Sequence, residues 1–153
     1  MFRSVWIGMA AMATIAAAYA AQVVYSGGSA EAGGCGNSSL SGSYGFSISG
    51  TAIDPSSGGT EEIIGVAMTQ FDGRGGLTQV DNIHGALSGT VTDRSGSGPY
   101  QVNPDCSGTM TLNVPGIPFP IQLRIVVVDN GHEVRTAVMG GPNLVTSIGK
   151  SAK

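Results

Sequence analysis

Charged residues are scarce in this sequence, and basic residues are fewer than acidic ones. Asp, Glu, Lys and Arg make up 11% of the 153 residues, with ten acidic side chains against seven basic ones. Nucleic-acid binding requires clustered Lys and Arg, which this sequence lacks, so we expect no nucleic-acid partner. Long surface helices also need Glu, Lys and Arg, whereas the abundant Gly and Ser are typical of strands and tight turns.

Residues with catalytic or metal-binding chemistry are also few. His84 and His132 are the two histidines, and the sequence has no Gly-x-Ser-x-Gly elbow, no P-loop and no residues at metal-ligand spacing. The segment Asp72-Gly73-Arg74-Gly75 is superficially similar to a calcium loop but offers one carboxylate, so we interpret it as a hairpin turn. We therefore expect no metal and no cofactor, and we disfavour hydrolase and metalloenzyme functions.

The first twenty residues have the pattern of a secretory signal peptide. Arg3 supplies a positive charge, residues 5–18 are uncharged and mostly apolar, and Ala18-Tyr19-Ala20 matches a cleavage site. The apolar run is too short for a comfortable membrane span, so we expect cleavage after Ala20 and no integral membrane segment in the mature chain. The sequence thus predicts a secreted or periplasmic protein.

Two cysteines, Cys35 and Cys106, remain after that cleavage. In an oxidising compartment such a pair most simply forms one disulfide. The bridge would close a loop of about 70 residues and stabilise the fold by roughly 4 kcal/mol in the chain-entropy account. Residues 21–38 are rich in Gly and Ser and are predicted to form a flexible arm, which precedes a single domain over residues 39–150.

From Leu40 onward, short segments alternate apolar and polar residues and are separated by Gly, Pro, Asn and Asp, a pattern typical of all-β domains. We predict about eight strands, at roughly 40–50, 60–71, 77–92, 100–102, 110–114, 121–129, 132–139 and 143–149. Eight short antiparallel strands avoid open edges best by closing on themselves. A small antiparallel β-barrel is therefore the favoured architecture, and a β-sandwich is the alternative.

The segment Asp129-Asn130-Gly131-His132 predicts the most specific local structure. Asn-Gly supplies the two positive-φ residues of a type I′ hairpin turn. A two-residue loop aligns Val127 with Val134, Ile125 with Thr136 and Leu123 with Val138, which gives an almost wholly apolar face. The same register places the charged side chains on the outer face, namely Arg124, Glu133 and Arg135. This register favours exposed cross-strand ion pairing for them over binding of an anionic ligand.

Several strings resemble a group of small exported bacterial β-proteins whose function is largely unassigned. They are Leu40-Ser41-Gly42-Ser43-Tyr44-Gly45-Phe46, Phe71-Asp72-Gly73-Arg74-Gly75, and the segment from Pro99 to Leu112 that contains Cys106. The resemblance covers most of residues 35–149 and implies a signal peptide and a compact β fold, with no catalytic residues to transfer. In architecture alone, the expected barrel is also similar to lipocalin-like and allene-oxide-cyclase-like proteins.

The third predicted strand is cleanly apolar on neither face. Its odd positions include Asp81 and its even positions include Asn82 and His84, and one of these faces must point inward. A buried polar group without a partner costs about 1–3 kcal/mol, so the inward residues must be hydrogen-bonded or face a wet cavity. The candidate catalytic residues are His84, as a general base with Tyr44 or Tyr100 orienting a substrate, and Asp81. A histidine on the surface, or satisfied internally, is the alternative.

The first functional hypothesis is a barrel that binds a small, mostly apolar molecule. The predicted inner face carries Tyr44, Phe46, Ile48, Val66, Met68, Leu123 and Ile125, and Asn82 and Tyr100 are predicted polar contacts. A second hypothesis is a cofactor-free isomerase or cyclase that uses His84 or Asp81 inside the same barrel. A third is a structural surface or matrix protein with a solid core and no ligand.

Overall fold

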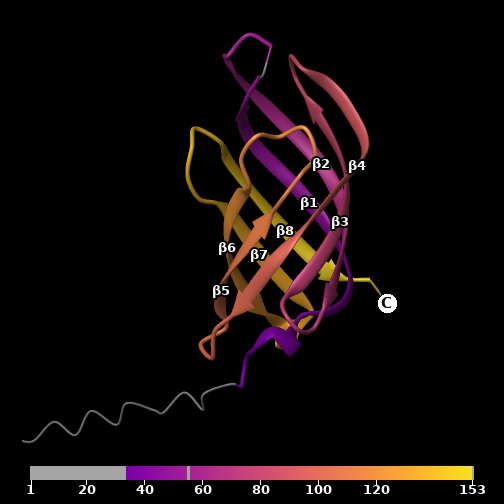
Figure 1. The fold of residues 1–153 in the computed structure, drawn as a ribbon, viewed down its shortest axis with the longest axis vertical. Coiled ribbons are helices and arrows are strands. Elements are labelled where there is room, and N and C mark those ends of the chain that lie inside the picture. The colour runs from indigo at the N-terminus through magenta and orange to yellow at the C-terminus, as the bar shows by residue number, and fades with distance from the viewer. Residues whose placement is uncertain (1–33, 55, 153) are drawn as a thin grey trace, which may run out of the picture.

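The computed structural model describes residues 34–54 and 56–152, which form a closed antiparallel β-barrel (Figure 1). Every strand pairs with its neighbour in the chain, and β1 pairs with β8 to close the barrel. The elements are η1 (Asn37–Ser39), β1 (Ser41–Ile53), β2 (Thr60–Asp72), β3 (Gly76–Gly85), β4 (Gly89–Val102), β5 (Ser107–Leu112), β6 (Ile121–Val128), η2 (Asp129–Gly131), β7 (Glu133–Val138) and β8 (Leu144–Ser151). The barrel prediction is thus confirmed.

Two expectations about the N-terminal part of the chain concern residues outside those described. The predicted signal peptide, residues 1–20, lies there, as does most of the predicted arm at 21–38. From residue 34 onward, no helix is long and apolar enough to cross a membrane, leaving aside the undescribed residues 55 and 153.

The predicted third strand over 77–92 is wrong in its extent, because the chain reverses within it. Gly85 pairs with Gly89 at the end of the β3–β4 hairpin, and Gly89 has a φ of 80°, which glycine adopts without strain. Glu61 on β2 fixes this turn, since its carboxylate accepts the Leu87 and Ser88 N–H groups at 2.8 and 2.9 Å. Residues 86–88 therefore form a turn, and β4 is correspondingly long.

Large side chains fill one end of the barrel, which we call the floor. Phe71 is 1% exposed, and its ring contacts Tyr44 and Tyr100 edge-on, with centroid separations of 5.2 and 5.0 Å. Leu40, which follows η1, is fully buried beside them in the same core cluster. Burial raises the pKa of the Tyr44 and Tyr100 hydroxyls, so both remain protonated donors.

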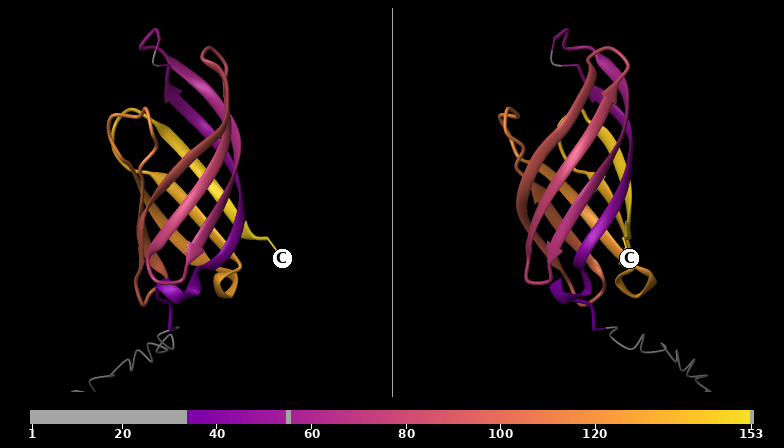
Figure 2. Two further views of the ribbon diagram at one scale, coloured as in Figure 1. Left: turned by 45° about the vertical axis from the view of Figure 1, so that its right-hand side comes forward. Right: turned by 90° about the vertical axis from the view of Figure 1, so that its right-hand side faces the viewer.

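Hydrogen bonds and the disulfide attach η1 to this floor. The Tyr100 hydroxyl donates to the carbonyls of Asn37 and Leu40, both at 2.9 Å, and the Asn37 side chain accepts the Val102 N–H at 2.8 Å. Cys35 and Cys106 form the predicted disulfide across the same end of the barrel. The start of the described chain is thus held against the barrel, and it closes the lower end (Figure 2).

The predicted hairpin between β6 and β7 is confirmed in register and in turn geometry. Val127 pairs with Val134, and the pairing continues to Leu123 and Val138. Asn130 and Gly131 have φ values of 50° and 86°, as the two central residues of a type I′ turn require. Arg135 and Glu133 form an ion pair at 2.8 Å on the outer face, as the register predicted.

The inward face of β2 is the reverse of the predicted one. Val66 and Met68 point outward and are 59% and 51% exposed. The pairing with β1 sets this orientation, because inward-facing Phe46 lies opposite Ala67. The ring of Phe46 fills the space that the small side chain of Ala67 leaves inside the barrel. Because side chains alternate along a strand, Val66 and Met68 then lie on the outer face.

Candidate ligand-binding cavity

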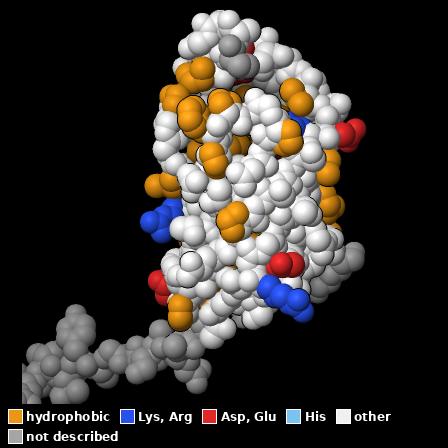
Figure 3. All heavy atoms as spheres, in the orientation of Figure 1, with side chains coloured by type: hydrophobic (Ala, Val, Ile, Leu, Met, Phe, Trp, Pro, Cys, Tyr) orange, Lys and Arg blue, Asp and Glu red, His pale blue; other side chains and the backbone are white. Residues whose placement is uncertain are grey.

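The upper half of the barrel is hollow. A cavity of about 520 Å³ extends from above the floor to the end of the barrel that carries the β1–β2 and β3–β4 turns, which we call the mouth. Hydrophobic side chains gather around a hollow in this half of the surface (Figure 3). The apolar lining includes Phe46, Ile48, Ala52, Ile53, Ile63, Ile83, Val91, Leu112, Ile117, Leu123, Val138 and Val145.

Unequal strand lengths keep the mouth open. β1 to β4 are ten to fourteen residues long, whereas β5 to β8 have six to eight. The β1–β2 and β3–β4 hairpins therefore rise above the opposite wall (Figures 1 and 2). On the low side, the segment between β5 and β6 contributes Gly116, Ile117 and Pro118 to the cavity wall.

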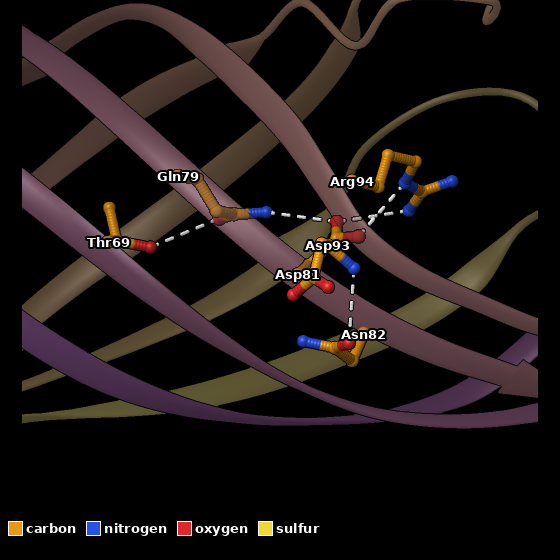
Figure 4. Close-up of polar contacts among 6 residues, drawn as sticks. All are labelled: Thr69, Gln79, Asp81, Asn82, Asp93 and Arg94. Carbon is orange, nitrogen blue, oxygen red and sulfur yellow. Dashed lines mark hydrogen bonds and ion pairs between the residues drawn. The ribbon is translucent and has the colours of Figure 1, made fainter.

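One side of the interior carries a polar chain of side chains from β2, β3 and β4 (Figure 4). Thr69 donates to the Gln79 carbonyl oxygen at 3.1 Å, and the Gln79 amide donates to Asp81 at 3.2 Å. Arg94 completes the chain by a two-pronged contact, with Nε and a terminal nitrogen 2.9 and 3.0 Å from the two Asp81 oxygens. The carboxylate of Asp81 is almost fully buried, and its charge is compensated by this guanidinium.

A β-bulge directs Arg94 into the interior. Asp81 pairs with Arg94 and Ile83 pairs with Val91, so β4 holds one more residue than β3 between these pairs. Asp93, in the bulge, has a φ of 51°, and its N–H donates to the Asn82 side chain at 3.1 Å (Figure 4). If the pairing of Ile83 with Val91 continued without the bulge, Arg94 would lie opposite a β3 residue that faces outward. The extra residue therefore reverses which β4 side chains face inward.

Glu61 is a further charged residue of the cavity lining and lies near the mouth. It is buried, and the Ser88 and Leu87 N–H groups that bind it hold the pKa of its carboxyl below the usual range. Glu61 is therefore ionised at neutral pH and is occupied in holding the β3–β4 turn.

The structure brings only some of the predicted binding residues to the cavity. Phe46 and Leu123 line it, and Asp81 does so as part of the polar chain. Ile125 is buried within the core cluster. Tyr44 and Tyr100 belong to the floor, where their hydroxyls bind backbone carbonyls, so they are not in the cavity lining.

The remaining predicted site residues face outward. Met68 is exposed, as described above, and Asn82 binds the bulge from the outer side. His84 is exposed, with Nδ1 2.9 Å from the Thr90 hydroxyl. Because Asp81 takes the inward positions of β3, the period of two places His84 outside, and a role for it inside the barrel does not fit its position.

Sequence reasoning missed Arg94 and Gln79 as site residues. Gln79 shares the odd positions of β3 with Asp81, so choosing that face would have found it. Arg94 gives no comparable signal, since its orientation depends on the bulge. Among the described residues, no group of three or more His, Cys, Asp or Glu side chains is placed to hold a metal ion.

Fold and cavity together define a small, disulfide-bonded, eight-stranded β-barrel with a hollow upper half. No family model and no curated protein matches the sequence. Among solved structures, a redesigned β-barrel is similar to this chain, with 15% identity and a TM-score of 0.49, over 76% of this chain and 95% of that one.

Proposed function

We propose that this protein is an exported barrel that binds a small, mostly apolar molecule. The observation that carries the proposal is the cavity of about 520 Å³, whose lining is mainly apolar and carries the polar chain that ends in Arg94. Small-molecule sites have volumes of roughly 300–1,000 Å³, with mainly hydrophobic linings and a few polar groups that orient the ligand. The filled floor leaves the mouth as the main route into this space.

Binding is tested by filling the cavity from one strand. Leu123 on β6 points into the cavity, whereas Val126 on the same strand is exposed, so Leu123→Trp and Val126→Trp form a matched pair. We expect Leu123→Trp to weaken binding of a neutral apolar dye such as Nile red at least tenfold, and Val126→Trp to leave it unchanged. Overpacking costs about 1–3 kcal/mol, so the melting temperature of each variant is measured alongside. Equal binding by both folded variants would contradict the proposal.

Native mass spectrometry addresses the natural ligand directly. Protein purified from its own host without organic solvent should carry a small molecule that denaturation releases. The same sample tests export, because cleavage after Ala20 fixes the mass of the mature chain. The Cys35–Cys106 disulfide is consistent with an extracellular or periplasmic location.

The isomerase or cyclase alternative has weaker support from the site. Of its two candidate residues, only Asp81 faces the interior, and three N–H donors from Arg94 and Gln79 already bind its oxygens. A carboxylate held in this way is poorly placed to take a proton from a substrate, because three hydrogen bonds from the protein already bind its two oxygens. The arrangement favours a role for Asp81 in positioning Arg94.

A structural protein that self-associates is the second candidate, and one observation favours it. Ile64, Val66 and Met68 on β2 and Val80 on β3 form an apolar strip on the outer face, in which Met68 pairs with Val80. Exposed apolar patches commonly mark contact surfaces. Sedimentation at increasing concentration tests this candidate. Assembly that Val66→Ser abolishes would support it, and a monomer at all concentrations would exclude it.

A further inference from the structure

Arg94 has hydrogen-bonding capacity that the protein does not use. A guanidinium carries five N–H donors, and two of them bind Asp81. In the described part of the chain Arg94 has no other hydrogen-bond partner, its side chain is 26% exposed, and it lines the cavity. No buried side-chain polar atom there lacks a partner, so Nη1, which has none, reaches accessible space. Its N–H groups are available to an acceptor inside the cavity.

The acceptors of the same polar chain are already occupied. Asp81 receives N–H groups from Arg94 and Gln79, and the Gln79 carbonyl oxygen receives the Thr69 hydroxyl. Glu61 receives two backbone N–H groups. The polar chain therefore offers the cavity the unused N–H groups of Arg94, and a ligand that complements them supplies an acceptor.

The charge of the cavity distinguishes among ligands that carry acceptors. Its described lining contains three charged side chains, of which Arg94 and Asp81 neutralise each other and Glu61 adds a negative charge. A carboxylate entering this apolar space would lose its hydration, and the net charge of the lining around it would be negative. The single cation of the described lining, Arg94, is already paired with Asp81. An uncharged carbonyl or ether oxygen loses far less hydration and still accepts from Arg94.

We infer that the barrel selects an uncharged apolar molecule with one carbonyl-type oxygen, which accepts a hydrogen bond from Arg94 while its hydrocarbon part extends toward the mouth. This inference rests on the proposed binding function and names the ligand class for that same cavity. Apolar residues such as Ile63 and Val145 surround the hydrocarbon part.

The test uses four ligands with the same hydrocarbon chain: a methyl ketone, the alkane, the carboxylate and the primary amine. Each competes with Nile red for the oxidised mature protein at pH 7. We expect the ketone to bind about tenfold more tightly than the alkane, which is the effect of roughly one hydrogen bond, and more tightly than either charged ligand. A carboxylate or amine that binds best would overturn the inference while leaving the binding function intact. If none of the four displaces the dye and the dye itself does not bind, the proposed function fails instead.

Asp81→Asn provides a second, independent arm. The substitution keeps the side-chain volume and removes the compensating charge, so Arg94 becomes an unpaired cation. We expect the preference to move toward the carboxylate by about tenfold relative to wild type, with little change for the alkane. An unchanged ketone-to-carboxylate ratio in the folded variant would show that Arg94 does not contact the ligand's polar end. If the variant does not fold, the wild-type ligand series alone decides.

Discussion

Phe71→Leu should remove much of the energy that holds the floor together. The ring is 1% exposed and makes edge-on contacts with Tyr44 and Tyr100. Each such aromatic pair contributes about 0.5–1.5 kcal/mol beyond burial, so two pairs give about 1–3 kcal/mol. Incomplete filling of the space by leucine adds about 1 kcal/mol. We therefore expect the free energy of unfolding to fall by about 2–4 kcal/mol.

Urea denaturation followed by far-ultraviolet circular dichroism measures this loss, with the disulfide intact. Phe119→Leu is the matched control, because Phe119 is 77% exposed and the same substitution should change the unfolding free energy by less than about 0.5 kcal/mol. A loss below about 1 kcal/mol for Phe71→Leu, or equal losses for the two variants, would refute the assignment of this ring as the centre of the floor.

Two further outcomes concern the bridge and acid stability. Replacing Cys35 and Cys106 by serine should lower the free energy of unfolding by about 4 kcal/mol, because the bridge spans 71 residues; a change under about 1 kcal/mol in urea denaturation would contradict this estimate. Hydrogen bonds, first from the Ser57 hydroxyl and then from Ser56, lower the Asp54 pKa to about 2. A depressed folded-state pKa stabilises the fold above the unfolded value near 4, and this contribution is lost as the pH falls toward 2. Wild type should therefore lose more stability than Asp54→Asn between pH 5 and pH 2, and parallel urea titrations would exclude the effect.

The β6–β7 hairpin shows what the sequence was able to predict. Asn130-Gly131 determines the turn, the turn determines the register, and the register orients every side chain of both strands. The alternating segments gave the strand number and the closed barrel in the same way, and the cysteine pair gave the disulfide. These features depend on local chemistry or on simple counting.

The orientation of β2 was not predictable by the same rule. Its inward positions hold Gly65 and Ala67, whereas larger apolar residues, among them Val66, occupy the outward positions. A prediction from hydrophobicity alone therefore places the wrong face of β2 toward the barrel interior. The deciding factor is the volume of Phe46 and Ile48 on β1, which lie opposite the two small residues. That information resides in the pairing of two strands and not in either strand alone.

The candidate site was predicted only in part for a related reason. Asp81 was one of two alternatives that the alternation of β3 left open. Arg94 faces inward because a single extra residue interrupts the alternation of β4 beside Asp93. A bulge has no distinctive amino-acid composition, so it is not recognised in the sequence. A prediction from alternation alone therefore assigns the residues beyond the bulge to the wrong face of the strand.

The filled floor also determines where the protein can be attached to a surface or fused to another protein. Gly34, where the described chain starts, leads into the disulfide at the floor, and Ser151 near its end donates its N–H to His132 beside the β6–β7 turn. Both ends therefore leave the barrel away from the mouth (Figure 1). A sensor surface or fused reporter joined at either end would keep the opening unobstructed and facing the surrounding solution.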